Sequence, residues 1–134
     1  MKQVILFVTL LFGLLANFQC ITLAQTSTAS SECKNECVTC TSVCEQTLNH
    51  CLKHKGKHTE PSHIKALKDC ISTCRQSADF ITRSSELQKA ACNLCEQACT
   101  RCAESCEIFV DDKTMQDCAK ECRKCADDLQ KMAG

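Results

Sequence analysis

Residues 92–106 read CNLCEQACTRCAESC, so that cysteines occupy positions 92, 95, 99, 102 and 106. Successive cysteines are three or four residues apart, which places their side chains on one face of an α-helix. The same spacing recurs in three other segments, and no alternation of period two indicates a β-strand. The sequence therefore predicts an all-α fold in which thiols occupy the seam that leucine occupies in an ordinary helical bundle.

Fifteen of the sixteen cysteines lie on this seam, and only Cys20 lies elsewhere. These fifteen thiols are the candidate metal ligands of the helical interior. They are Cys33, Cys37, Cys40, Cys44, Cys51, Cys70, Cys74, Cys92, Cys95, Cys99, Cys102, Cys106, Cys118, Cys122 and Cys125.

The links between the four predicted helices are short. The first helix should begin near Ser31 and end near Gly56, and Pro61 suits the first turn of the second. Residues 82–85 and 108–113 should form the other two links. Because short links favour antiparallel neighbours, we expect an up-down-up-down antiparallel four-helix bundle with a cysteine-lined core.

Capping boxes are expected at the starts of the last two helices. In this motif two side chains three residues apart satisfy free backbone N–H groups of the first turn. Ser85 with Gln88 would begin the third helix, and Thr114 with Asp117 would begin the fourth.

The N-terminal segment has the features of a signal peptide. An apolar run over residues 4–15, too short to span a bilayer comfortably, follows a basic start, and small residues precede a predicted cut after Ala24. We therefore assign residues 1–24 to a signal peptide, 25–31 to a flexible lead-in and 32–134 to the cysteine-rich bundle. The mature protein should be exported, to the periplasm or to the outside of the cell.

Composition excludes several classes of partner and activity. The chain has 16 basic and 16 acidic residues, and it has no Trp or Tyr and no concentrated basic face, so a nucleic-acid partner is disfavoured. No other long apolar run follows the leader, and no membrane association is expected after its removal. No Ser/His/Asp set or open metal site with a water position can be assembled, so we do not expect an enzyme.

A buried seam of thiols is costly unless the thiols bind something. Cysteine in place of leucine loses about 1–2 kcal/mol of apolar burial at each position. Metal binding to the folded chain adds to its stability and offsets this loss. Disulfide bonds are the alternative for an exported cysteine-rich protein, but the mature chain has an odd number of cysteines and none in a predicted link. Metal coordination by free thiols is therefore the preferred interpretation.

Thiolates select Cu(I), Zn(II) or iron–sulfur clusters. Clusters are usually held by irregular chain next to a proline, whereas these cysteines are helical and the only proline is Pro61. Structural zinc needs discrete sets of four ligands, which a continuous seam does not suggest. Cu(I) needs only two thiolates, which cysteines at i and i+4 of one helix can supply. Six pairs have this spacing: Cys33/Cys37, Cys40/Cys44, Cys70/Cys74, Cys95/Cys99, Cys102/Cys106 and Cys118/Cys122.

The repeated C-x3-C steps, as in CKNECVTCTSVC at residues 33–44 and CNLCEQACTRCAESC at 92–106, resemble those of the bacterial four-helix-bundle copper storage proteins. The resemblance covers the mature chain and is closest to the exported members. It implies storage of multiple Cu(I) ions per chain on interior thiolates, and a homo-oligomer, namely a tetramer of bundles. Exported members often have a twin-arginine leader, whereas this leader has no arginine. We therefore expect export of the unfolded chain, with copper loading afterwards.

All four histidines lie between residues 50 and 63. His54 extends the seam of the first helix, and His63 and Met115 lie on the seams of the second and fourth. His58 is either the next seam position or part of the link. In an up-down-up-down bundle these four side chains meet at one end. Because imidazole and thioether bind Cu(I) more weakly than thiolate does and can pass it inward, the candidate ligands of a copper-capturing mouth are His54, His58, His63 and Met115.

The opposite end of the predicted bundle is mostly apolar. Ile81, Leu129 and Met132, with Gln88, form a plug there, so copper should enter at the histidine end. His50 lies off the seam and is interpreted as a surface residue. The alternative for the histidine cluster is a solvated helix end that binds nothing.

Three functions from different classes are open at this point. Copper storage is the first, a disulfide-stapled extracellular helical interaction domain is the second, and a copper chaperone or sensor with one or two sites is the third.

Overall fold

The computed structural model describes residues 2–133, with side chains from Thr28 onwards. Its helices are α1 (Lys2–His54), the short 3-10 helix η1 (Gly56–Thr59), α2 (Pro61–Thr82), α3 (Gln88–Glu107) and α4 (Lys113–Ala133). Residues 2–133 contain no strand. The chain divides into two compact units, Met1–Ser30 and Ser31–Gly134, and the bundle is the second.

The predicted signal peptide, residues 1–24 with a cut after Ala24, lies outside the residues whose side chains are described. It stays a prediction, and the same holds for any role of Cys20. Within the described part of the chain, no helix has the combination of length and apolarity that crossing a bilayer requires.

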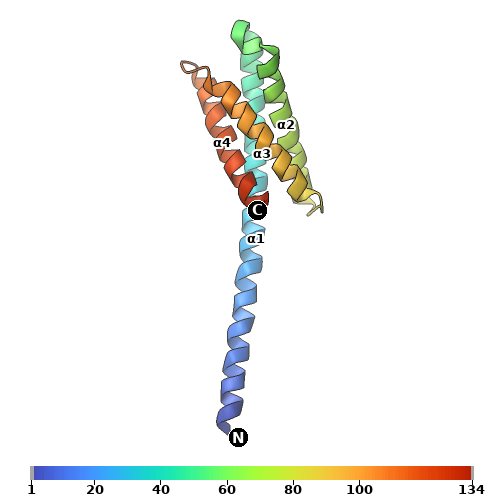
Figure 1. Cartoon of the computed structure of the whole chain (residues 1–134), viewed down its shortest axis with the longest axis vertical. Coiled ribbons are helices and arrows are strands. Elements are labelled where there is room, and N and C mark those ends of the chain that lie inside the picture. The colour runs from blue at the N-terminus through green and yellow to red at the C-terminus, as the bar shows by residue number, and fades with distance from the viewer. Residues whose placement is uncertain (1, 134) are drawn as a thin grey trace. The chain divides into compact units, whose positions relative to one another are not determined.

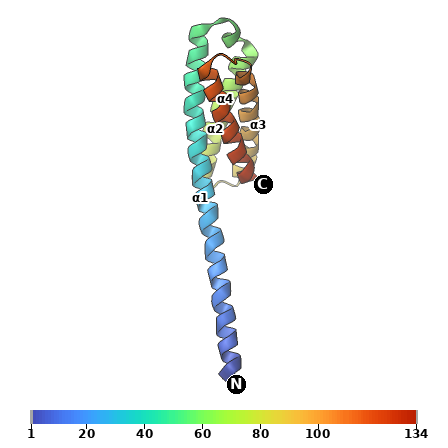
Figure 2. The same cartoon turned by 90° about the vertical axis from the view of Figure 1, so that its left-hand side faces the viewer.

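The second unit is an antiparallel bundle of four helices. Figures 1 and 2 show these helices side by side, with their links at alternating ends. α3 packs along both α2 and α4. The sulfurs of Cys40 and Cys44 on α1 contact cysteines of α2 and α4 respectively. The predicted up-down-up-down bundle with a cysteine-lined core is therefore confirmed.

The turn between α1 and α2 contains two residues with positive φ. Lys55 has a φ of 62° and a ψ of −162°, a region nearly restricted to glycine that costs lysine about 1–3 kcal/mol. Gly56 has a φ of 58°, which glycine adopts freely. Lys53 and His54 are the basic residues of the last turn of α1, where they complement the helix dipole. α2 then begins at Pro61, so the two predicted boundaries of this link are confirmed.

The capping box predicted for the third helix is wrong. α3 begins at Gln88, and its capping residue, Leu87, makes no side-chain cap. The hydroxyl of Ser85 instead accepts the N–H of Leu87 at 3.2 Å. Ser84 has a φ of 50°. The residues expected in the first turn of the third helix therefore form a tight turn that precedes α3.

The capping box predicted for the fourth helix is also wrong. α4 begins at Lys113, and the carboxylate of Asp112 accepts the N–H groups of Thr114 and Met115 at 3.0 and 3.3 Å. The cap lies two residues before the expected Thr114, because a charged carboxylate accepts these N–H groups more strongly than a hydroxyl does.

The lead-in expected over residues 25–31 is helical in the full-length chain, because α1 runs through it. Its sequence, QTSTASS, contains neither glycine nor proline, so nothing in it stops a helix. We expect a flexible segment in the mature chain, in which Gln25 would be the first residue. The flexibility of residues 25–31 in the mature chain stays a prediction.

Sulfur and small side chains fill the core. All fifteen seam cysteines are at most 2% exposed, and the largest fully buried apolar side chains are Leu67, Met115 and Leu129. The small residues beside the cysteines are Ala78, Ala91, Ala98, Ala103, Ala119 and Ala126. Because alanine adds little bulk, the helices approach closely enough for their sulfurs to meet.

The end of the bundle opposite the histidines is closed by apolar side chains. Ile81 and Leu129 are 5% and 0% exposed, and Met132 packs against this core. Gln88, the first residue of α3, is half-buried. This arrangement is the one expected of the apolar plug.

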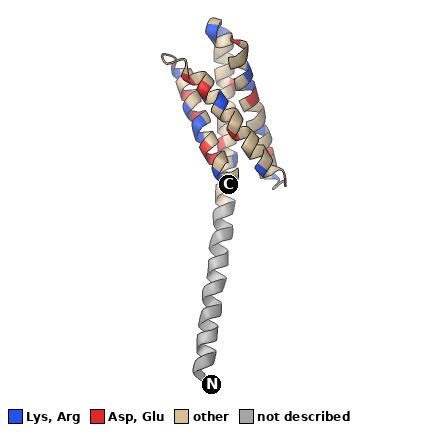
Figure 3. Ribbon diagram, viewed as in Figure 1, with Lys and Arg blue, Asp and Glu red and all other residues tan. Residues whose placement is uncertain are grey.

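Charged residues of both signs are spread along the helices of the bundle (Figure 3). Ion pairs join neighbouring helices: Glu45 with Arg75, Glu107 with Arg123, and Glu36 with Lys124. Glu36 is buried, whereas the pairs of Glu45 with Arg75 and of Glu107 with Arg123 are exposed and contribute about 0–1 kcal/mol each. Burial of the core therefore has to provide most of the stability, and this core has little apolar volume.

We predict that the reduced, metal-free chain is already mostly helical, because the links, caps and the buried Leu67, Met115 and Leu129 act without metal. Copper should raise the thermal midpoint by on the order of 15 °C or more while changing helix content little. Circular dichroism of the reduced apo protein, before and after Cu(I) loading, measures both quantities. A random-coil spectrum that turns helical only with copper would contradict the prediction, since folding would then depend on metal as it does in zinc fingers.

Candidate metal centre

The fifteen seam cysteines are free and buried, and their sulfurs contact one another across the bundle. The shortest distances between Sγ atoms are 3.4 Å from Cys95 to Cys74 and 3.5 Å from Cys44 to Cys122. Each of these contacts joins two different helices. Among residues 28–133 no disulfide bond is formed.

Contacts within one helix are no shorter than contacts between helices. The i,i+4 pairs Cys70/Cys74 and Cys95/Cys99 have Sγ atoms 4.0 and 3.9 Å apart, whereas Cys99 lies 3.6 Å from both Cys70 and Cys74. The sequence identified only the pairs within a helix, because side-chain spacing along one helix carries no information about its neighbours. The folded chain offers a metal ion ligands from several helices at once.

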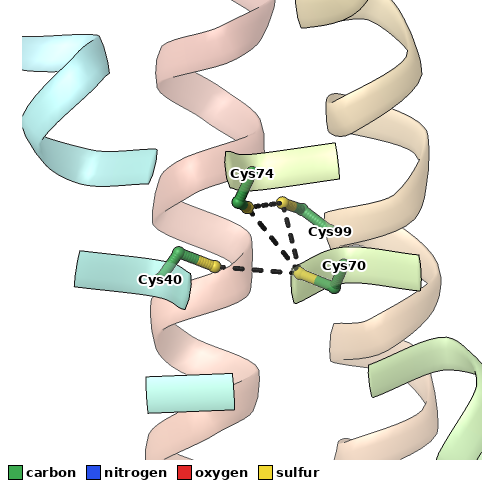
Figure 4. A group of neighbouring side chains, drawn as sticks. All are labelled: Cys40, Cys70, Cys74 and Cys99. Carbon is green, nitrogen blue, oxygen red and sulfur yellow. Dashed lines mark hydrogen bonds between the residues drawn. The ribbon is translucent and has the colours of Figure 1, made fainter. Parts of the chain in front are cut away.

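The sulfurs also form sets of four, which the seam had not suggested. Three such sets have all their ligand atoms within 4.8 Å of one another: Cys40/Cys70/Cys74/Cys99, Cys40/Cys44/Cys70/Cys122 and Cys44/Cys102/Cys118/Cys122. Figure 4 shows the first set, whose sulfurs come from α1, α2 and α3 and point toward one another.

These sets overlap, and the overlap determines which metal ion they can bind. The first two share Cys40 and Cys70, and the last two share Cys44 and Cys122. Three separate tetrahedral zinc sites of the usual structural kind would need four ligands each of their own. A network of shared sulfurs suits an ion that needs fewer thiolates and accepts bridging ones, as Cu(I) does.

The environment keeps thiols at the two ends of the network protonated. Burial raises the pKa of Cys51 to about 11, and Cys118 and Asp112 act in the same direction. The pKa of Cys33 is raised to about 12, chiefly by its hydrogen bond with Cys37. Thiols with such pKa values are uncharged near neutral pH, so a metal ion has to displace a proton to bind them.

At the histidine end, a mixed set of soft ligands borders the thiols. The sulfur of Cys51 lies 3.4 Å from Nε2 of His63 and 3.7 Å from Sδ of Met115. His63 and Met115 are 3% and 0% exposed, and Nδ1 of His63 hydrogen bonds to the hydroxyl of Ser105. Burial lowers the pKa of His63, which keeps its imidazole neutral and able to bind metal.

The other histidines lie in a separate outer cluster. Nε2 of His50 and Nε2 of His58 lie 2.7 and 2.9 Å from Oδ2 of Asp112. His54 is exposed, and its ring centroid lies 4.1 Å from that of His50 and 5.4 Å from that of His58. The four expected mouth residues are therefore near one end of the bundle, but His54 and His58 do not contact Cys51 as His63 and Met115 do.

Sequence reasoning missed two members of this outer cluster. His50 was interpreted as a surface residue, yet it is half-buried against Asp112. The available signal was its position one turn before His54 on the same helix. Asp112 was not identified, because the sequence placed the start of the fourth helix at Thr114. In the structure Asp112 caps α4, and its carboxylate contacts His58 of η1.

Burial alone would raise the pKa of Asp112. Hydrogen bonds from His50, His58 and the N–H of Met115 outweigh burial and hold that pKa below its usual range. The carboxylate is therefore ionised at neutral pH.

Comparisons with known proteins agree with this geometry. The sequence model described as "Csp: Copper storage protein" matches residues 26–134. A comparison with curated proteins found no match. Among solved structures, the Nmul_A1745 protein of Nitrosospira multiformis has a TM-score of 0.74 and 32% identity, with 80% of this chain and 96% of that chain covered.

Two further structures are those of copper storage proteins by name. Cu(I)-bound BsCsp3 has a TM-score of 0.75 and 27% identity, over 79% of this chain and 99% of that chain. Apo-Csp3 from Bacillus subtilis has a TM-score of 0.72 and 28% identity, over 78% of this chain and 99% of that chain. With the family match extending over the whole thiol-lined bundle, this chain belongs to the copper storage protein family.

Proposed function

We propose that this protein stores Cu(I) in quantity on the thiolates of its interior. The observation that carries the proposal is the network of fifteen buried, unbonded cysteines contributed by all four helices. Membership of the copper storage family and similarity to a Cu(I)-bound relative support the same metal and the same role. Such a role is binding without catalysis.

The proposed interior ligands are the fifteen seam cysteines. Contacts such as Cys44 with Cys122 and Cys70 with Cys99 support binding of ions between helices as well as along them. Because each sulfur lies near several others, one thiolate is able to bridge two ions, which raises the number of ions beyond what separate pairs would hold.

The proposed mouth consists of His54, His58, His63 and Met115. His63 and Met115 are its inner part, because both contact Cys51, the first thiol at that end. His54 and His58 are its outer part. Neutral imidazole and thioether hold Cu(I) less tightly than thiolate does, so an ion captured there moves inward downhill in free energy.

The other two functions have less support. A disulfide-stapled domain needs paired cysteines, and none are paired among residues 28–133. A copper chaperone or sensor needs one or two sites, whereas three overlapping four-cysteine sets already use eight different cysteines.

We further propose an exported protein, periplasmic or extracellular, with residues 1–24 removed, 25–31 as lead-in and 32–134 as the bundle. The basic start and the short apolar run of the leader support export. A homo-oligomer, a tetramer by analogy with the family, is also proposed. Leu94 and Ile108, which are 53% and 69% exposed and border a groove between α2 and α3, are suitable for such a contact.

We predict binding of about ten to fifteen Cu(I) ions per chain, because sulfurs shared between ions allow nearly one ion per cysteine. Anaerobic titration of the reduced protein against a chromophoric Cu(I) chelator gives the number directly. Saturation at one or two ions would exclude storage and favour the chaperone or sensor. Zinc bound at comparable stoichiometry in place of copper would change the assignment of the metal.

Cu(I) affinity should keep rising with pH between about 6 and 10, by up to tenfold per unit for each proton displaced. The reason is that the raised pKa of Cys51, about 11, leaves this thiol protonated throughout that interval. Competition with the same chelator at several pH values measures the trend, and a pH indicator in weak buffer measures the protons released. An affinity that levels off near the usual thiol pKa of about 8.5 would contradict the raised value.

Replacing the inner mouth residues, His63→Gln with Met115→Leu, should slow Cu(I) uptake by roughly tenfold, equivalent to about 1.4 kcal/mol of barrier. Capacity should change little because the thiols are intact. The matched control, Cys33→Ser with Cys92→Ser at the plug end, should lower capacity by about one or two ions and leave the initial rate unchanged. Stopped-flow uptake measures both quantities. Loading of the mouth variant at the parental rate would show that copper enters elsewhere.

A further inference from the structure

Outside the thiol interior, three side chains from three segments converge on one point. His50 lies near the end of α1, His58 in η1, and Asp112 immediately before α4. Their ligand atoms, two imidazole nitrogens and one carboxylate oxygen, all lie within 4.8 Å of one another. The side chains are 22%, 20% and 20% exposed, so the cluster is shielded from bulk water without being closed to it.

A fourth ligand is within reach of this cluster. His54 follows His50 by one helical turn, and their ring centroids are 4.1 Å apart. Two histidines at i and i+4 of a helix can bind one metal ion together. Because His54 is exposed, its side chain is free to turn toward the ion without disturbing the core.

The ligands of this cluster differ in kind from those of the interior. Imidazole suits Zn(II), Cu(II), Ni(II) and Fe(II), and a carboxylate adds a negative charge that favours a divalent ion, whereas Cu(I) is selected by thiolate and thioether. Three imidazoles with one carboxylate also provide the four ligands that tetrahedral zinc takes. The outer cluster contains no sulfur, so it favours a divalent ion over Cu(I). His54 and His58, as the outer part of the proposed mouth, would hold Cu(I) only weakly on its way inward.

An aromatic ring lies between the outer cluster and the inner mouth. The ring of Phe109 lies 4.4 Å from that of His58 and 5.0 Å from that of His63, measured between centroids. Two sets of ligands therefore exist at this end of the bundle, and no residue belongs to both.

We propose that His50, His58 and Asp112, completed by His54, form a site for one divalent transition-metal ion of the Zn(II) and Cu(II) class. The site lies outside the thiol interior and shares His54 and His58 with the outer part of the proposed mouth, but it does not depend on the storage function. An ion bound there joins the end of α1, η1 and the start of α4, which are the segments that frame the mouth.

Zinc binding to protein whose thiols are already occupied tests the proposal. The protein is first loaded with Cu(I) without oxygen, and Zn(II) is then titrated against a chromophoric zinc chelator. We expect one Zn(II) per chain in addition to the copper. Co(II) in place of Zn(II) should give the visible spectrum of nitrogen and oxygen ligation, without a sulfur-to-cobalt charge-transfer band. The part of this spectrum that Asp112→Asn removes reports on the outer cluster whether or not the interior is filled, so failure of this site and failure of copper storage are distinguishable.

Two variants remove ligands with little change to the fold. Asp112→Asn removes the carboxylate but keeps a side chain that caps α4, because asparagine is as good an N-cap as aspartate. His50→Ala removes one imidazole from the surface of α1. Each should lower Zn(II) affinity at least tenfold, since even residues outside the coordination shell contribute about 10–100-fold. Asp111→Asn, which removes an exposed charge next in the chain, is the matched control and should bind zinc like the parent.

Three results would overturn the proposal: no zinc bound by the copper-loaded protein, zinc binding unaffected by Asp112→Asn and His50→Ala, or a sulfur band in the cobalt spectrum. In the first case the cluster is a hydrogen-bonded contact between η1 and the start of α4. In the other two cases zinc binds elsewhere, and a sulfur band would place it among the thiols.

Discussion

The close approach of sulfur atoms across the bundle is the constraint on which the rest of the structure depends. Thiols on separate helices reach distances of 3.4–3.6 Å, as between Cys95 and Cys74 or Cys70 and Cys99, only if nothing larger lies between the helices. Alanines such as Ala103 and Ala119, buried beside the cysteines, satisfy that condition. The use of alanine and cysteine leaves the core with little apolar volume. The stability of the metal-free chain therefore depends on a few leucines and methionines, and metal binding contributes further free energy of folding.

Because the sulfurs lie so close together, neighbouring sets of four share ligands. This sharing distinguishes the interior from an ordinary metal site. A structural zinc site has its own four residues, and its neighbours are remote. Here Cys40, Cys44, Cys70 and Cys122 each belong to two sets of four. Such a network has no single site to fill, and ions placed at different positions find similar surroundings. It is suited to holding many ions.

At the histidine end of the bundle, the ligands become softer from the surface toward the interior. Outermost are imidazoles and a carboxylate, His50, His58 and Asp112, which are half-buried. Deeper lie His63 and Met115, which contact Cys51 and are shielded from water. Beyond them are thiols alone. Burial accompanies the change in ligand type, so each layer favours a softer and less hydrated ion than the one outside it.

The sequence by itself determined the helices, their directions and the identity of the buried thiols, because the three- and four-residue spacing of cysteine fixes a face and short links fix antiparallel neighbours. It also placed the histidines at one end. Only the tertiary structure decided which sulfurs are neighbours, since distances between helices depend on packing and not on spacing along one chain. It also decided that Asp112 caps α4 and holds His50 and His58, a contact between residues more than fifty positions apart that no local pattern encodes.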